Sequence, residues 1–190
     1  MNALTDYILR LESHIPAAVC DAIIEESKEI EYSTHRFYDH GNGTHYDLSG
    51  EQELSISFDL TPSHEELRSY FYSAIDGYCS YLNSPFLNSW NGFTMPRLNK
   101  YEPNQKMAAH VDHIHDMFDG EKRGIPILSI VAALNQEKQD YTGGEFIFFD
   151  NLPVSLNKGD ILTFPSNFMY PHHVNPVIEG IRHTAVSWVW

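Results

Sequence analysis

Positive charge is scarce in this sequence. Its 12 Lys and Arg residues stand against 26 Asp and Glu residues, which gives a formal net charge of −14. A chain this acidic has no general attraction for the phosphates of nucleic acid or for an anionic membrane surface. We therefore expect no nucleic-acid and no membrane partner, although a nucleic-acid substrate held by a local basic patch stays open.

Cysteines and long apolar runs are also scarce. The 2 cysteines, Cys20 and Cys79, stand at no spacing typical of a metal or redox site. We interpret them as two buried thiols of a protein in a reducing, cytoplasmic setting. The N-terminus lacks a basic stretch followed by an apolar run, and no apolar run is long enough to span a bilayer. These absences predict neither a secretion signal nor a membrane-spanning segment.

The rest of the composition is that of an ordinary soluble globular protein. Hydrophobic residues make up 42% and charged residues 20% of the 190 residues. This length favours a single domain over residues 1–190, long enough to enclose a core. We find no internal repeat that would divide it.

Two helices are predicted in the first half of the chain. Residues 15–30 carry apolar side chains at helical spacing, with charged residues between them. A second apolar stripe runs from Ser63 to Leu82, and Ser63 with Glu66 forms the pattern of a capping box. We therefore expect residues 1–85 to supply helical support.

A polar segment separates these two helices. Residues 31–55 are rich in Gly, His, Tyr and Asp, and Gly41-Asn42-Gly43 is a strong turn signal. We interpret the segment as a loop or an irregular pair of strands. It is either a lid over a bound peptide or a plain surface loop.

The second half changes to short apolar runs that are broken by turns. The clearest predicted strands are residues 127–134, 146–149, 161–164 and 184–190. Short strands at fairly even spacing are typical of a sandwich or barrel. The predicted fold class is α+β, mainly β: a jelly-roll core (a double-stranded β-helix) over about 86–190, backed by the N-terminal helices.

The motif His110-Val111-Asp112 is the strongest indication of chemistry. On a strand, residues two apart point to the same face, so His110 and Asp112 present an imidazole and a carboxylate together. A second His from another strand would complete the ligand set of a non-haem Fe(II) oxygenase, which leaves positions open for cosubstrate and O₂. His172 and His173 both qualify, and spacing alone does not choose between them.

A local zinc cluster is the alternative interpretation of these histidines. His110, Asp112, His113 and His115 lie close together in sequence and superficially resemble the ligand run of metallo-β-lactamases, in altered order. That class needs further ligands at the strand ends of an α/β-type sandwich, which the strand and helix pattern does not supply. We expect His113 and His115 to lie in an exposed loop over residues 113–124.

Taken together, the motifs from Arg97 to Trp190 resemble the Fe(II)/2-oxoglutarate oxygenases of the prolyl 4-hydroxylase group. The resemblance rests on the order and spacing of individually weak motifs. These are Arg97-Leu98-Asn99-Lys100-Tyr101, His110-Val111-Asp112-His113, Ile130 to Asn135, Gly143-Gly144-Glu145-Phe146, Lys158-Gly159-Asp160 and the run from His172 through Pro176-Val177 to Gly180 and Arg182. The stretch from Phe164 to His172 is also similar to compact members of the group carried by phages.

The resemblance implies a role for each of five residues. His110, Asp112 and His172 would be the catalytic metal ligands, Arg182 would anchor 2-oxoglutarate, and the Tyr101 hydroxyl would be a second donor to it. Thr163 or Ser187 could line the cosubstrate pocket in place of Tyr101. The implied cofactors are Fe(II), 2-oxoglutarate and O₂, with ascorbate as a further candidate.

Five positions distinguish this chain within and around that group. Arg182 and His183 stand where collagen-type enzymes have Lys and Trp, and Met107 replaces a Tyr, so a collagen-like substrate does not follow. AlkB-type nucleic-acid demethylases carry an Arg at the position of Trp188. Related halogenases lack the carboxylate, so Asp112 favours hydroxylation.

The predicted function is therefore hydroxylation of a C–H bond with release of succinate and CO₂. By resemblance, the substrate is a prolyl residue in a peptide or protein. The alternatives are a hydroxylase of a free amino acid or small molecule, and a cupin-like metal-binding module without oxygenase activity. Arg182 and Tyr101 argue against such a module, because a structural metal site needs no anchor for a second carboxylate. The sequence does not indicate an oligomeric state.

Overall fold

The computed structural model describes residues 3–39, 44–46, 52–83, 87, 90–112 and 126–190. Its helices are the 3₁₀ helix η1 (Leu4–Tyr7), α1 (Ala17–Glu26), the 3₁₀ helix η2 (Ser27–Glu29) and α2 (His64–Leu82). The strands of the first half are β1 (Leu9–Leu11), β2 (Ser33–Thr34), β3 (Phe37–Asp39), β4 (Thr44–Tyr46) and β5 (Ser55–Ser57). Those of the second half are β6 (Arg97–Tyr101), β7 (Met107–His110), β8 (Leu128–Ala133), β9 (Tyr141–Gly143), β10 (Phe146–Phe148), β11 (Leu152–Val154), β12 (Ile161–Pro165), β13 (His172–Val174), β14 (Val177–Gly180) and β15 (Arg182–Val189).

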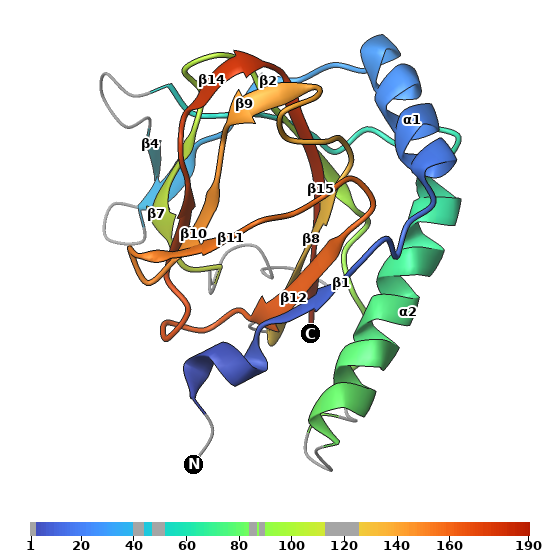
Figure 1. The fold of residues 1–190 in the computed structure, drawn as a ribbon, viewed down its shortest axis with the longest axis vertical. Helices are drawn as coiled ribbons and strands as arrows, with labels where there is room; N and C mark the ends of the chain where they lie inside the picture. The colour runs from blue at the N-terminus through green and yellow to red at the C-terminus, as the bar shows by residue number, and fades with distance from the viewer. Residues whose placement is uncertain (1–2, 40–43, 47–51, 84–86, 88–89, 113–125) are drawn as a thin grey trace.

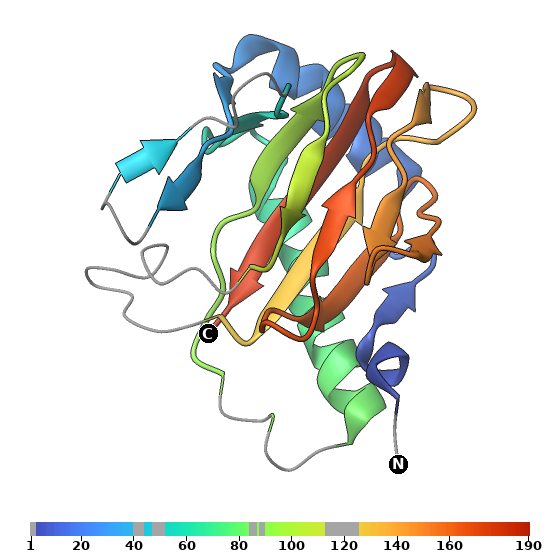
Figure 2. The ribbon, with the colours of Figure 1, turned by 90° about the vertical axis from the view of Figure 1, so that its left-hand side faces the viewer.

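The strands form two main antiparallel sheets. The larger sheet has the order β1-β12-β8-β15-β6-β5-β2, and the smaller one has the order β11-β10-β13-β7. Two further strand pairs, β14-β9 and β3-β4, stand beside them. Figure 1 shows α1 and α2 along one side of the large sheet and the small sheet along its other side. Viewed from the small sheet, the helices lie behind the strands (Figure 2). The fold is thus mainly β, with few helices.

The core on the helix side follows from the helical spacing of the sequence. Leu67, Phe71 and Ile75 of α2 are fully buried, at positions that share one helix face. They pack in one cluster with Ile130 and Ala132, which point from β8 toward the helices. Each large apolar side chain buried here contributes roughly 1.5–3 kcal/mol to folding.

A second apolar cluster lies between the two sheets. Because strand side chains alternate, Val131 and Ala133 of β8 face this cluster, where they meet Phe146, Phe148 and Phe164. The central strand β8 is therefore buried on both faces, which explains its unbroken apolar sequence.

Most predicted elements are present, with small shifts at their ends. The helix predicted over 15–30 is α1 followed by η2. The four strands that the sequence predicts in the second half correspond to β8, β10, β12 and β15. The capping box is wrong: Ser63 precedes α2, but its side chain makes no cap hydrogen bond. Instead its amide N–H and hydroxyl donate to the carboxylate of Glu26, at the end of α1, over 2.9 and 2.7 Å.

The polar segment between the helices contains short strands. β3 pairs with β4, and β2 pairs with β5 at the edge of the large sheet. The interpretation as an irregular strand pair is therefore confirmed in its described part, while residues 40–43 and 47–51 lie outside the described residues. Its role as a lid stays a prediction. The loop predicted for residues 113–124 also lies outside the described residues.

Both cysteines lie in helices, as expected. Cys20 in α1 is fully buried, and burial raises the pKa of its thiol to about 11. Cys79 in α2 is only half-buried, so the prediction of two buried thiols is wrong for this residue. Among the described residues, no helix is long and apolar enough to cross a membrane.

Candidate active site

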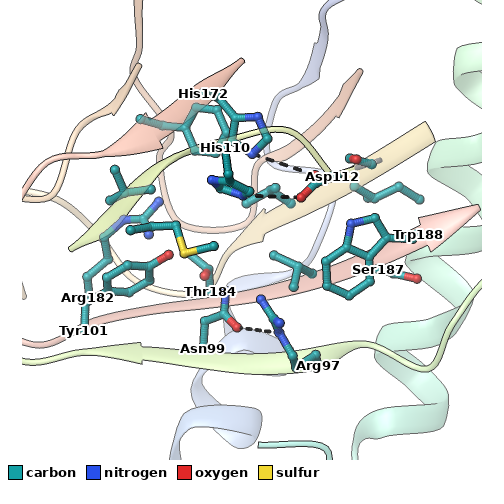
Figure 3. Close-up of a pocket in the computed structure, with 17 residues that line it drawn as sticks. Arg97, Asn99, Tyr101, His110, Asp112, His172, Arg182, Thr184, Ser187 and Trp188 are labelled. Carbon is teal, nitrogen blue, oxygen red and sulfur yellow. Dashed lines mark hydrogen bonds and ion pairs between the residues drawn. The ribbon is translucent and has the colours of Figure 1, made fainter. Parts of the chain in front are cut away.

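A cavity of about 430 Å³ lies between the two sheets. The side chains that matter below project into it from strands of both sheets and from the residues just after β7 (Figure 3). They are Arg97, Asn99, Tyr101, His110, Asp112, His172, Arg182, Thr184 and Trp188, and Ser187 also lines the cavity.

Two histidines and one aspartate meet in this cavity. His110 ends β7 and His172 begins β13, and the two residues are directly opposite each other in the small sheet. Asp112 lies just beyond the end of β7. Its carboxylate oxygens are 3.3 Å from Nε2 of His110 and 3.7 Å from Nε2 of His172. Two side chains from one motif and a third from 60 residues further on thus present their polar atoms to one point.

Hydrogen bonds to the backbone set the tautomer of both histidines. Nδ1 of His110 lies 2.8 Å from the carbonyl oxygen of Ala108, and Nδ1 of His172 lies 3.1 Å from that of Tyr170. A carbonyl oxygen only accepts, so each Nδ1 carries the proton and each Nε2 keeps its lone pair. This is the arrangement that orients histidine as a metal ligand.

The electrostatics of the cluster favour a neutral His172 imidazole beside an ionised Asp112 carboxylate. Burial, with the neighbouring His110, lowers the pKa of His172 to about 4. Burial opposes ionisation of Asp112, but His172, His110 and the Ser129 hydroxyl outweigh it and hold the pKa of Asp112 below its ordinary value. At neutral pH, His172 and Asp112 can therefore accept a cation without first losing a proton.

The donor set fits a divalent transition metal with open coordination positions. One ligand atom from each of the three residues lies within 4.8 Å of the others. Ligands about 2.1 Å from a common ion and at right angles to each other are about 3 Å apart, so a bound ion would draw these atoms closer together. Two imidazoles and a carboxylate are the ligand set of non-haem Fe(II) oxygenases.

The geometry also separates the two adjacent histidines. His172 turns toward Asp112, whereas His173 is opposite Ile147 of β10 and projects to the other side of the strand. His172 is almost fully buried and His173 is half-buried. These positions favour His172 as the ligand, as the family resemblance implies.

Arg182 and Tyr101 form one end of the cavity. They are directly opposite each other on β15 and β6, and the Arg182 guanidinium carbon lies 4.9 Å from the centre of the Tyr101 ring. Arg182 is 3% exposed, and its buried Nη1 has no hydrogen-bond partner among the described residues. Burial raises the pKa of Tyr101, so its hydroxyl keeps its proton. The unpaired Nη1 of Arg182, with the Tyr101 hydroxyl beside it, would suit a carboxylate.

The alternatives to Tyr101 are less well placed. Thr163 is fully buried in β12 and is not among the residues that line the cavity. Ser187 lines the cavity, but its hydroxyl donates to the carbonyl oxygen of Thr94 over 2.7 Å. Thr184 lies two residues after Arg182 and on the same face of β15. Its buried hydroxyl has no partner among the described residues.

Sequence reasoning missed the opposite end of the cavity. Arg97 and Trp188 lie there, 6% and 5% exposed, with the guanidinium 4.9 Å from the centre of the indole ring. Burial lowers the pKa of Arg97 to about 10, which still leaves it cationic at neutral pH. A signal was available, because Arg97, Asn99 and Tyr101 alternate along one strand and so share a face.

The chain belongs to the 2OG-Fe(II) oxygenase superfamily, whose profile matches residues 96–190. It is 30% identical over 97 residues to a PKHD-type hydroxylase of Methylobacillus flagellatus, an alignment that covers 50% of this chain and 42% of the relative. A PKHD-type hydroxylase of Synechococcus elongatus is 32% identical over 94 residues, covering 48% of this chain and 40% of the relative. The chain thus matches less than half the length of these curated relatives.

Solved structures of prolyl hydroxylases share the fold. The Trichoplax adhaerens enzyme, solved with a peptide fragment of the hypoxia inducible factor oxygen degradation domain, gives a TM-score of 0.72 at 16% identity, covering 98% of this chain and 84% of that one. Viral collagen prolyl hydroxylase from Paramecium Bursaria Chlorella virus-1 gives 0.69 at 15% identity, covering 96% and 95%. A Pseudomonas putida prolyl-4-hydroxylase gives 0.65 at 19% identity, covering 96% and 91%.

Proposed function

We propose that this protein is an Fe(II)- and 2-oxoglutarate-dependent dioxygenase that hydroxylates a C–H bond of its substrate. His110, Asp112 and His172 would hold the ferrous ion. Arg182, assisted by Tyr101, would bind the distal carboxylate of 2-oxoglutarate. Ascorbate as a further cofactor stays a prediction from the resemblance. The two facing sheets are interpreted as the halves of a double-stranded β-helix, and residues 1–190 as one oxygenase domain.

One observation carries the proposal. A buried guanidinium nitrogen without a partner among the described residues lies in the same cavity as an open-sided His-Asp-His cluster. Leaving a buried donor unpaired costs about 1–3 kcal/mol, so the arrangement is explained best by an acceptor that binds there. A cupin-like module that only stores a metal would need the cluster but not Arg182.

The reaction balances without a further reductant. Substrate C–H, 2-oxoglutarate and O₂ yield substrate C–OH, succinate and CO₂. Bound Fe(II) would supply the activation of O₂. The protein's part is to orient the keto acid through the Arg182 fork, to hold Asp112 ionised and His172 neutral, and to exclude water with the apolar side chains that line the cavity.

For the substrate, we infer a prolyl residue in a peptide or protein. The shared fold with prolyl hydroxylases supports this choice, as does the peptide bound to the Trichoplax adhaerens structure. A free amino acid or other small molecule is the second candidate. The acidity of the chain and Trp188, at the position of an Arg in nucleic-acid demethylases, favour both over nucleic acid.

Anaerobic visible absorption tests the assignment. Metal-free protein is titrated with Fe(II) and then with 2-oxoglutarate, because chelation of the keto acid to ferrous iron gives a weak charge-transfer band that neither component gives alone. We expect this band in the wild type and in His173→Ala, and its loss in His172→Ala. The two substitutions remove the same side chain at adjacent positions. They differ only in that His172 and His173 lie on opposite faces of β13.

The outcomes separate the two classes of protein. If iron binds but no band forms, the site does not accept the keto acid, and the metal-binding module becomes the better interpretation. If the band persists in His172→Ala and is lost in His173→Ala, the choice of ligand is wrong. A higher half-saturating concentration of 2-oxoglutarate in Arg182→Ala would support the anchor.

A further inference from the structure

The cavity has a cation at each end. Side chains of β6 alternate, so Arg97 and Tyr101 project from the same face, four residues or about 13 Å apart along the strand. Tyr101 accompanies Arg182 at one end, and Arg97 stands at the other, beside Trp188 (Figure 3). The His-Asp-His cluster lies above the space between them. The Arg182 end suits 2-oxoglutarate, which leaves the Arg97 end without a ligand.

Arg97 is not neutralised by the protein around it. Among the described residues, its one hydrogen-bond acceptor is Oδ1 of Asn99, which Nε reaches over 3.0 Å, and no carboxylate lies within ion-pair distance. The rings of Trp188 and Phe58 lie 4.9 and 6.0 Å from its guanidinium carbon. A buried cation without a counter-ion is costly. Its terminal nitrogens therefore have hydrogen-bonding capacity to offer to a ligand.

A second unused donor lies at the same end. The buried indole Nε1 of Trp188 has no partner among the described residues. Indole nitrogen only donates, so this group too calls for an acceptor rather than a cation. Attraction to Asp112 does not account for Arg97, because that carboxylate lies beyond ion-pair distance and is already the partner of two imidazoles.

We propose that Arg97 binds a carboxylate of the primary substrate and so sets which carbon is presented to the metal. This inference rests on the proposed oxygenase function and deepens it by naming the substrate class. The planar guanidinium pairs with a carboxylate through two parallel hydrogen bonds, which fix orientation as well as contribute affinity. The carboxylate belongs either to the main chain of a free or C-terminal residue or to an acidic side chain.

Three matched pairs of probes test the substrate class. In each pair, one member carries a carboxylate and the other carries an uncharged amide in its place. The pairs are L-proline and L-prolinamide, acetyl-Gly-Pro and its C-terminal amide, and an amidated peptide with an internal Pro-Glu or Pro-Gln. Succinate formation is followed with iron-loaded enzyme, 2-oxoglutarate and O₂. We expect the carboxylate of at least one pair to stimulate succinate formation and the corresponding amide not to stimulate it. The pair that responds identifies the source of the carboxylate.

Substitutions then assign the effect to Arg97. Arg97→Gln should raise the half-saturating concentration of the active acid by roughly thirtyfold or more, whereas Arg97→Lys, which keeps the charge, should retain part of the preference. Half-saturation by 2-oxoglutarate, read from the anaerobic band, should shift by less than about twofold, because Arg182 is unchanged. The matched control is Arg68→Gln, which removes another guanidinium that stands over an aromatic ring, Phe93, outside the cavity.

The remaining outcomes overturn the proposal. If acids and the corresponding amides stimulate equally, or no acid stimulates, Arg97 does not select a substrate carboxylate. If Arg97→Gln lowers the melting temperature and leaves the acid preference unchanged, its role is structural. A shift in 2-oxoglutarate saturation instead of substrate saturation would make Arg97 a cosubstrate residue. Failure of the oxygenase function itself is distinguishable, because the band would then be absent from the wild type.

Discussion

The large sheet has one face toward the helices and one face toward the cavity, and the two faces differ in polarity. On β6, Leu98 faces the helices, while Arg97 and Asn99 line the cavity. On β15, Ala185 faces the helices and Thr184 lines the cavity. The same strands therefore provide an apolar surface on the helix side and place buried polar groups among the apolar side chains on the cavity side.

The cavity face keeps several donors without partners. Among the described residues, these include Nη1 of Arg182, Oγ1 of Thr184 and Nε1 of Trp188. Each unpaired buried group costs about 1–3 kcal/mol, so this face lowers the stability that the helix face provides. Polar side chains held unpaired in a cavity are expected where ligands complete the hydrogen bonds. Substitutions on the cavity face should therefore reduce activity more than stability, and those on the helix face should do the reverse.

The largest expected effect on activity is that of Asp112→Ala. Removing the only carboxylate of the cluster leaves two imidazoles as ligands, so both Fe(II) affinity and the charge balance at the metal are lost. Turnover of 2-oxoglutarate should fall to the detection limit, while the melting temperature of the metal-free protein changes by only a few degrees. Full activity in this variant, measured as succinate formed, would exclude Asp112 as a ligand.

The largest expected effect on stability is that of Phe71→Ala. Phe71 is fully buried between α2 and the large sheet, so the cavity left behind should lower the free energy of unfolding by about 3–5 kcal/mol. The matched substitution on the cavity face is Thr184→Val, which replaces an unpaired hydroxyl with a methyl group. Because it removes a buried hydroxyl without a partner among the described residues, it should leave the free energy of unfolding unchanged or raise it by up to about 3 kcal/mol. Urea denaturation of both metal-free variants measures the difference, and equal losses would contradict the division between the faces.

An intermediate effect is expected from the pH dependence of stability. Burial, with the nearby Lys100, lowers the pKa of His183 to about 4, from an ordinary value of 6.5. Below pH 6.5 the unfolded chain takes up a proton that the folded protein does not, so this residue's contribution is complete above pH 6.5 and is lost as the pH falls toward 4. Between pH 7 and 5, metal-free wild type should lose on the order of 1–2 kcal/mol more than His183→Gln.

His183 separates this effect from metal binding, because it projects to the opposite side of β15 from Arg182. His35 and His172, whose pKa values burial lowers to about 3 and 4, should act in the same direction and so remain as a common background in both proteins. Identical slopes for wild type and His183→Gln would show that His183 protonates equally in the folded and unfolded states.

Much of the fold and site was predictable because it follows from local periodicity. The apolar stripe that ends at Leu82 marks α2, and the alternation of side chains places His110 and Asp112 together. Whether His172 or His173 meets them depends on the pairing of β13 with β7, which spacing in the sequence does not reveal. The family resemblance supplied that choice.

The features that were missed depend on contacts between distant segments. Arg97 acquires its place through the register of β6 against β15, which brings it beside Trp188. Whether Arg97 has a counter-ion depends on the side chains of every element around the cavity, so a local sequence pattern cannot predict that it lacks one. The capping box failed for the same reason, because a partner from another helix, Glu26, takes the hydrogen bonds of Ser63.

The smallest predicted effect concerns the contact between Ser63 and Glu26, where α1 meets α2. A double-mutant cycle between Ser63→Ala and Glu26→Ala should give a coupling free energy of about 1 kcal/mol, because the Ser63 hydroxyl donates to that carboxylate. The parallel cycle with Glu66→Ala should give a coupling close to zero. Each cycle cancels what a carboxylate contributes to its own helix, so the comparison isolates the pairwise contact. Coupling to Glu66 and not to Glu26 would contradict this contact. It would show that Ser63 forms the capping box that the sequence predicts, within α2 itself.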